Sequence, residues 1–253
     1  MLSQNLITSP LEQFEIVTLV PLTFFGLNIS VTNSVLFMIF AFLIAIFWIS
    51  LSFYKNSVIP NNWQLVKEMV YNVTASIVQD NLGSKGEFYF PFVFTLHLFL
   101  LFCNLIGMVP YSFTVTSHIT FTFGLALSIF IGINIIGIQT HGFKFFALFL
   151  PRGVPLPIVP LLITIEFLSY IVKVFTLSIR LFANMTSGHT LLKIIAGFAW
   201  TMLSAGGLLA VFHIIPLGLL LALIGLELAI AGLQAYVFTL LTCIYLNDVL
   251  EFH

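Results

Sequence analysis

Residues 163–184 read ITIEFLSYIVKVFTLSIRLFAN, an apolar stretch that nevertheless carries Glu166, Lys173 and Arg180. These three residues follow one another at intervals of seven, which is almost two full helical turns. They therefore lie along one slowly drifting stripe of a helix. Ionisable side chains inside membrane helices are costly and usually mark an ion or substrate pathway. The stretch predicts a membrane helix with a functional polar stripe.

The composition of the whole chain predicts a protein embedded in a bilayer. Of its 253 residues, 60% are hydrophobic and only 7% are charged, whereas a soluble domain has about 25% charged residues. The mean hydropathy is +1.15. The net charge of −1 offers no basic face for nucleic acid. Cys103 and Cys243 lie in apolar runs without metal-ligand spacing, so we expect buried side chains and no metal site.

Hydropathy and helical periodicity predict an all-α integral membrane protein with about five membrane helices and one amphipathic surface helix. For the amphipathic segment, a short linker helix facing water is the alternative. A continuous helix from Pro160 to Met202 would be about 65 Å long, so it must be strongly tilted, broken near Ser187–Gly188 or partly outside the bilayer. We expect an N-terminal segment at 1–30, a first membrane helix at 31–54, the amphipathic helix at 61–86, a membrane helical hairpin at 88–138, a Pro/Gly loop at 139–159 and a tilted hairpin at 160–253.

The loop cations predict the orientation of the chain. They lie between the first and second spans and between the third and fourth, at Lys55, Lys67, Lys85, Lys144 and Arg152. Cationic loops favour the cytosol-equivalent side, so the N-terminus is expected on the opposite side and the C-terminus on the cationic side. The first 21 residues contain no Lys or Arg, so they resemble neither a signal peptide nor a basic presequence.

Folding the last hundred residues at Gly206–Gly207 brings polar residues level in pairs. Glu166 comes level with Asp248, Arg180 with Gln234 and His189 with Glu227. Arg180 and His189 are nine residues apart, or about 900°, so they point to opposite sides of a continuous helix. The pattern predicts two separate polar clusters, one at each end of the hairpin, with Arg180 between them.

This pattern predicts two dead-end proton paths. Carboxylates and histidine exchange protons near neutral pH when their surroundings shift them, whereas an arginine side chain stays protonated. Arg180 would then block a continuous proton wire and attract an acidic group supplied by another subunit. Three alternatives stay open: a structural ion pair for Arg180, a snorkelling cation for Lys173, and a helix-bridging role for Gln234.

Two longer motifs resemble the a subunit of F-type ATP synthases: LSIRLFANMTSGHTLL at 177–192 and LELAIAGLQAYVFTLLTCIYLND at 226–248. Three further segments are similar to the mitochondrial branch of that family: SPLEQFEI at 9–16, CNLIGMVPYSFTVTSH at 103–118 and LPRGVPLPIVPLL at 150–162. The likeness covers nearly the whole chain.

The resemblance implies roles for matching positions. Arg180 would be the essential cation facing the ring of c subunits, with Asn184 and Gln234 as supporting polar residues. His189 and Glu227 would form the proton entry half-channel, and Glu166 and Asp248 the exit half-channel. The role of Lys173, where relatives also carry arginine, stays open.

The resemblance also implies a place in the cell and a set of partners. The chain would be a stator subunit of the Fo sector in the mitochondrial inner membrane, with its N-terminus toward the intermembrane space and its C-terminus toward the matrix. Its tilted helices would lie against the c-ring, and other partners would be the peripheral stalk, other Fo membrane subunits and phospholipid. It would have no catalytic centre and no cofactor, and would translocate H⁺.

Two other classes of protein are weighed against this one. A secondary transporter or self-contained channel would carry inverted repeats and an internal shuttle carboxylate. A membrane-embedded enzyme would carry clustered catalytic or metal-ligating residues near one interface. We find neither pattern in the sequence.

Overall fold

The structure is a computed structural model that describes residues 12–21, 23–24, 27–28, 30–50, 60–109, 112–142, 145, 158–207 and 209–250. Its α-helices are α1 (Asn33–Ser50), α2 (Asn62–Leu82), α3 (Phe90–Gly107), α4 (Ile119–His141), α5 (Val159–Ala205), α6 (Leu209–Phe212) and α7 (Ile214–Leu250). Short 3-10 helices are η1 (Glu12–Phe14), η2 (Gly83–Phe88) and η3 (Val115–Ser117).

Five of the described helices are long and apolar enough to cross a membrane: α1, α3, α4, α5 and α7. This confirms the predicted all-α membrane fold. Helix α1 lies within the predicted 31–54 segment, and 51–59 fall outside the described residues. Most of the predicted Pro/Gly loop at 139–159 also falls outside them, and α4 extends into that range as far as His141.

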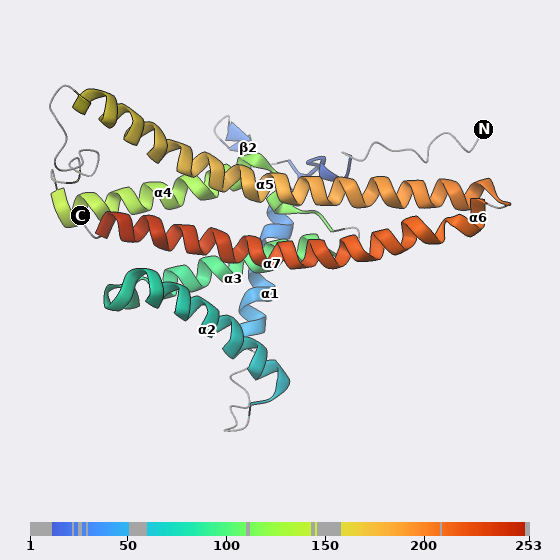
Figure 1. The fold of residues 1–253 in the computed structure, drawn as a ribbon, viewed down its shortest axis with the longest axis horizontal. Coiled ribbons are helices and arrows are strands. Elements are labelled where there is room, and N and C mark those ends of the chain that lie inside the picture. The colour runs from blue at the N-terminus through green and yellow to red at the C-terminus, as the bar shows by residue number, and fades with distance from the viewer. Residues whose placement is uncertain are drawn as a thin grey trace.

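Helices α5 and α7 form the predicted antiparallel hairpin and run side by side along the longest axis of the molecule (Figure 1). The turn lies at Gly206 and Gly207, whose φ angles of 70° and 62° are in the left-handed region that favours glycine. Helix α5 is continuous over 47 residues, about 70 Å, so it is not broken at Ser187–Gly188.

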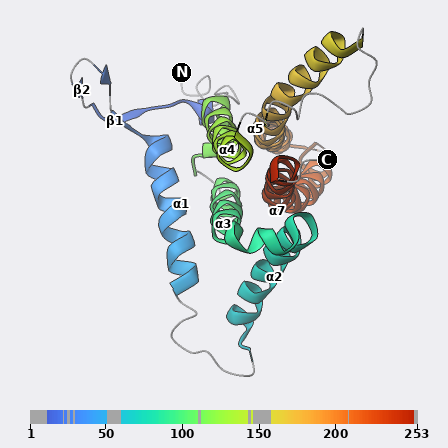
Figure 2. The same ribbon diagram turned by 90° about the vertical axis from the view of Figure 1, so that its left-hand side faces the viewer.

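The hairpin packs against two shorter helices. Viewed along the bundle, α3 and α4 lie beside α7 and α5, while α1 stands outside α3 (Figure 2). The shared core lies between α3, α4, α5 and α7, and its fully buried side chains include Leu100, Leu181, Phe238 and Leu246. The outward faces carry large exposed apolar side chains, as expected of surfaces in contact with lipid.

Helix α2 confirms the predicted helix in the amphipathic segment. Its first residues follow Asn61, whose side chain accepts a hydrogen bond from the Asn62 amide at 2.8 Å. Lys67 ties α2 to the end of α1, because its ammonium donates to the Ile49 carbonyl at 2.7 Å and lies 5.4 Å from the Trp48 ring centroid. A lysine is favoured there because the carbonyls of the last helical turn carry partial negative charge.

The N-terminal segment contains short strands that the sequence did not predict. Strand β1 (Thr18–Val20) pairs antiparallel with β4 (Val31–Thr32), and β2 (Thr23–Phe24) pairs with β3 (Leu27–Asn28). Asn33, the first residue of α1, holds this segment in place, because its amide group donates to the Glu15 carbonyl at 3.1 Å. Strands of two or three residues are too short to give a recognisable alternating pattern.

Candidate functional site

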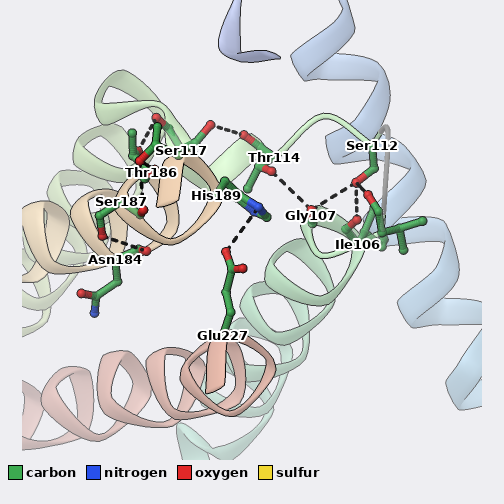
Figure 3. Close-up of polar contacts among 12 residues, drawn as sticks. Ile106, Gly107, Ser112, Thr114, Ser117, Asn184, Thr186, Ser187, His189 and Glu227 are labelled. Atoms are coloured by element: carbon green, nitrogen blue, oxygen red, sulfur yellow. Dashed lines mark hydrogen bonds and ion pairs between the residues drawn. The ribbon is translucent and has the colours of Figure 1, made fainter. Parts of the chain in front are cut away.

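The end of the hairpin nearer the turn contains the predicted pair of His189 and Glu227. His189 projects from α5 and Glu227 from α7, and the two side chains point toward each other (Figure 3). Nδ1 of His189 lies 3.3 Å from Oε1 of Glu227. The side chains are only 13% and 5% exposed, so the pair is shielded from solvent. The predicted proximity of these two residues is therefore confirmed.

The His189–Glu227 pair contains buried side-chain atoms that are free to take up or release a proton. Within the described part of the chain, Oε2 of Glu227 and Nε2 of His189 are buried and have no hydrogen-bond partner, while Oε1 of Glu227 has the contact with Nδ1 of His189. Buried polar groups are almost always hydrogen-bonded, so these exceptions call for an explanation. A carboxyl and an imidazole in contact, each with an unsatisfied atom, form a chemical unit able to take up and pass on a proton.

Gly188 allows the close approach of α5 and α7 at this pair, and sequence reasoning missed it. A Cβ atom built at this position would lie 2.7 Å from Oε1 of Glu227 and 3.0 Å from its Cδ. A side chain at this position would therefore require the carboxyl group of Glu227 to shift. The sequence signal was a glycine directly beside the histidine.

We expect Gly188→Ala to displace the Glu227 carboxyl group and to lower proton transport per assembled complex by about tenfold. Alanine in a helix interior is favoured over glycine by about 0.5–1 kcal/mol, so the loss is not one of helix stability. The measurement is ATP-driven proton pumping in membrane vesicles, normalised to the amount of complex. Gly197→Ala on the same helix is the matched control, because nothing lies within 4 Å of a Cβ there. Equal pumping by the two variants would contradict the steric role of Gly188.

A polar loop lies over this pair, contributed by the connection between α3 and α4. Thr186, one turn before Thr190, donates to the Ser117 carbonyl at 3.3 Å and so links α5 to η3 (Figure 3). His118 follows at the start of α4, stacked on Phe113 with ring centroids 5.0 Å apart. Burial lowers the pKa of the His118 imidazole, so its neutral form is favoured.

The opposite end of the hairpin differs from the prediction. Asp248 forms an ion pair with Lys173, whose Nζ lies 3.3 Å from Oδ2, so it is level with Lys173 and not with Glu166 as counting from the turn predicted. Glu166 is exposed and lies two turns before Lys173. Figure 1 shows the physical reason: the first turns of α5 diverge from α7. Residues at equal distances in sequence from the turn are therefore no longer opposite each other at the far end of the hairpin.

Lys173 is surrounded by groups that stabilise a cation. Its ammonium lies 5.9 Å from the Tyr170 ring centroid and 5.2 Å from that of Tyr245, distances at which an aromatic face attracts positive charge. The Tyr170 hydroxyl donates to Oδ1 of Asn134 at 3.0 Å, which fixes its ring against α4. Sequence reasoning found Lys173 and Asp248 but not these rings.

Arg180 lies on α5 between the two clusters and is exposed. It is nine residues from His189 and seven from Lys173, or about 13 Å and 10 Å along the helix. Its exposed neighbours are mixed in character: Ile179 is 48% exposed, and Thr176, one turn before Arg180, is exposed as well. Asn184 is half-buried one turn away, and Gln234 on α7 is 9% exposed. The arrangement is a cation exposed on the outer face of α5, between two ionisable clusters.

No group of three His, Cys, Asp or Glu side chains that could hold a metal ion occurs within the described residues. Both cysteines are free and buried. The side chains that the site presents are proton-exchanging groups and cations. These features define a helical membrane protein whose polar groups are arranged along two long helices.

Comparison with known proteins identifies the family. The chain belongs to the ATP synthase A chain family, and residues 34–247 match the sequence model of that family. It is 84% identical over 248 residues to ATP synthase subunit a of Chondrus crispus, covering 98% of both chains. It is 49% identical to ATP synthase subunit a of Marchantia polymorpha over 251 residues, covering 97% of this chain and 99% of the relative. The corresponding protein of Brassica napus is also 49% identical, over 256 residues and 97% of each chain.

Family membership settles the class of function. The chain is a proton-translocating stator component of the Fo sector and has no catalytic centre of its own, because the catalytic sites of the ATP synthase lie in F1. The resemblance seen in the sequence is confirmed. The roles expected of individual residues remain predictions.

Proposed function

We propose that this subunit presents two offset proton half-channels to a rotating ring of c subunits, with Arg180 as the barrier between them. The observation that carries the proposal is the position of Arg180, exposed on the outer face of α5 between two ionisable clusters. A charge on such a face requires a counter-charge from outside the chain. A carboxylate on a membrane-embedded ring supplies it.

In this proposal the entry half-channel ends at His189 and Glu227. Their contact at 3.3 Å and their unsatisfied buried atoms support a role in delivering protons. A proton leaves this pair for a ring carboxylate, which becomes neutral and can then turn into the lipid. Each proton crossing contributes about 2.3 kcal/mol per 100 mV of membrane potential, which drives the rotation.

The exit half-channel comprises Asp248 and Glu166, with Lys173 beside Asp248. The exposed carboxyl group of Asp248 supports release of protons at this end of the hairpin. Lys173 lies seven residues before Arg180 on the same stripe of α5. Its positive charge favours the ionised form of a ring carboxylate after that carboxylate has released its proton. Asn184 and Gln234 provide polar surroundings for the ring carboxylate near Arg180.

The setting is the mitochondrial inner membrane, with the N-terminus toward the intermembrane space and the C-terminus toward the matrix. The loop cations support this orientation. The c-ring, the peripheral stalk, other Fo membrane subunits and phospholipid are the partners. The transported species is the proton itself, and we propose no cofactor.

Disulfide cross-linking of adjacent residues tests whether the ring lies against this face. Ile179 lies beside Arg180 and is 48% exposed, whereas Ser178 lies on another face of the helix and is 0% exposed. We expect Ile179→Cys to cross-link to a cysteine placed next to the c-subunit carboxylate, and Ser178→Cys to give at least tenfold less product. Equal yields from the two positions would contradict a ring on the exposed face of α5.

Co-purification of the complex with a small, acid-bearing hairpin protein in several copies would separate this function from that of a transporter or membrane enzyme.

A further inference from the structure

We propose that His97 and Asn104 are positioning residues that fix the axial register of α7 against α3 and thereby place Glu227 opposite His189. The two polar side chains lie in the interior of an otherwise apolar membrane helix, 5% and 0% exposed. The consequence for proton transport rests on the proposed function, whereas the consequence for register does not.

The contact between α3 and α7 involves buried residues at regular helical intervals. Five of the eight buried residues of α3 follow alternating intervals of four and three: Val93, His97, Leu100, Asn104 and Gly107. Along α7 the fully buried residues at intervals of four are small: Ala231, Ala235, Thr239 and Cys243. Small residues allow two membrane helices to approach closely. Apolar packing of this kind is similar in several registers, because each small residue resembles the next.

Two hydrogen bonds join α3 to α7, and the one to a side chain distinguishes one register from the others. Nδ1 of His97 lies 3.2 Å from Oγ1 of Thr239, and Nδ2 of Asn104 donates to the Ala231 carbonyl at 3.1 Å. From the first bond to the second, α3 advances by seven residues and α7 goes back by eight. The two bonds thus belong to the same antiparallel register, and we call them the register contacts.

The hydroxyl of Thr239 also lies within donating distance of the Ala235 and Tyr236 carbonyls, at 3.0 Å and 2.8 Å. When its one proton is donated to either carbonyl, the hydroxyl accepts from the His97 tautomer that carries its proton on Nδ1. A threonine at this position is therefore matched to the histidine.

A slip of α7 by one helical turn would move it by about 5.4 Å. It would leave the imidazole of His97 opposite Ala235 or Cys243, neither of which carries a hydroxyl, whereas Asn104 would meet the backbone carbonyl of another residue of α7. In coiled coils a single polar residue at a seam position specifies register in the same way, at some cost in stability. The contact between His97 and Thr239 therefore selects among packings that apolar residues and backbone carbonyls alone would not separate.

The register matters because Glu227 lies one turn before Ala231 on the same helix. Its carboxyl group is 3.3 Å from His189 and fits against the backbone of Gly188. A displacement of one turn exceeds that distance and would separate the pair. The hydrogen bonds of His97 and Asn104 go to Thr239 and Ala231 of α7. These two residues therefore act on Glu227 through the position of α7.

Disulfide trapping tests the register directly and without reference to proton transport. Val93 lies four residues before His97 and Cys243 four residues after Thr239, and both are 0% exposed in the same core. In a Cys103→Ala background, we expect Val93→Cys to cross-link to the native Cys243. Adding His97→Leu with Thr239→Val removes one register contact and should lower the cross-linking rate at least fivefold. An unchanged rate would overturn the proposal.

An exchange variant separates loss of register from failure to assemble. His97→Thr with Thr239→His keeps the same two side chains in swapped positions, and we expect it to restore cross-linking to more than half of the original rate. An exchange variant no better than the double apolar variant would overturn the proposal. Thr242→Val is the matched control: Thr242 is 1% exposed and bonds to Phe238 of its own helix, so its loss should change nothing.

Proton transport links the register to the site. Per assembled complex, we expect His97→Leu with Thr239→Val to lower pumping about tenfold and to shift its pH profile, because the His189–Glu227 pair is disturbed. A role in stability alone would reduce the amount of complex but leave the pH profile unchanged, and that result would overturn the inference. The proposed function fails separately: it fails if Glu227→Gln pumps normally, whatever the cross-linking shows.

Discussion

Replacing Arg180 with alanine should abolish proton-coupled ATP synthesis while the complex still assembles. The side chain is exposed and forms no part of the core, so its removal costs little folding energy. At 4 Å and an effective dielectric constant of 20, a fixed cation stabilises a carboxylate by about 4 kcal/mol. That energy corresponds to a roughly thousandfold bias toward the ionised ring carboxylate, and the alanine variant lacks it. ATP synthesis in inverted vesicles with an imposed proton gradient measures the loss.

The lysine variant distinguishes charge from geometry. Arg180→Lys keeps a positive charge but not the planar guanidinium that can contact two carboxylate oxygens at once. We expect the rate of ATP synthesis by Arg180→Lys to stay below one tenth of the native rate. The companion measurement is passive proton leak through Fo, which should rise in Arg180→Ala because the barrier between the two half-channels is lost. Normal ATP synthesis by Arg180→Ala would refute the central role of this residue.

Replacing Glu227 with glutamine should reduce proton transport by about 100-fold, the lower range for loss of a positioned acid–base group. The amide has nearly the same shape, so it fills the space beside Gly188, but it cannot take up and release a proton. Assembly should be unaffected. Initial rates of ATP-driven proton pumping, normalised to assembled complex, test this.

Glu227→Asp is the informative control for that experiment. It keeps the carboxyl group but shortens the side chain by one methylene, which lengthens the 3.3 Å contact with His189. We expect transport intermediate between the native protein and Glu227→Gln. If the glutamine variant transported protons as fast as the native protein, Glu227 would not belong to the entry half-channel.

The sequence was sufficient to predict the architecture because each membrane helix must satisfy its own backbone hydrogen bonds. An uncharged run of sufficient length is then a reliable signal, and α1, α3 and α4 fall where the apolar runs place them. The turn at Gly206–Gly207 was equally clear. The strands at 18–32 were not, because their pairing depends on contacts between residues that carry no distinctive pattern.

Prediction of the site succeeded near the turn and failed away from it. Counting residues from Gly206–Gly207 placed His189 opposite Glu227 correctly, in the part of the hairpin where α5 and α7 run side by side. The same counting placed Glu166 level with Asp248, whereas Lys173 is the partner found. The first turns of α5 diverge from α7, and no local sequence pattern encodes that divergence.

The unbroken course of α5 has a mechanical consequence. Because His189, Arg180 and Lys173 are carried on one continuous helix, the distance between the two ionisable clusters is fixed by helical rise and not by bilayer thickness. The sixteen residues from Lys173 to His189 correspond to about 24 Å. A rod of this kind transmits sideways force without changing its length, so torque from a turning partner would be borne by the whole helix and passed to α4 and α7 rather than absorbed at a joint.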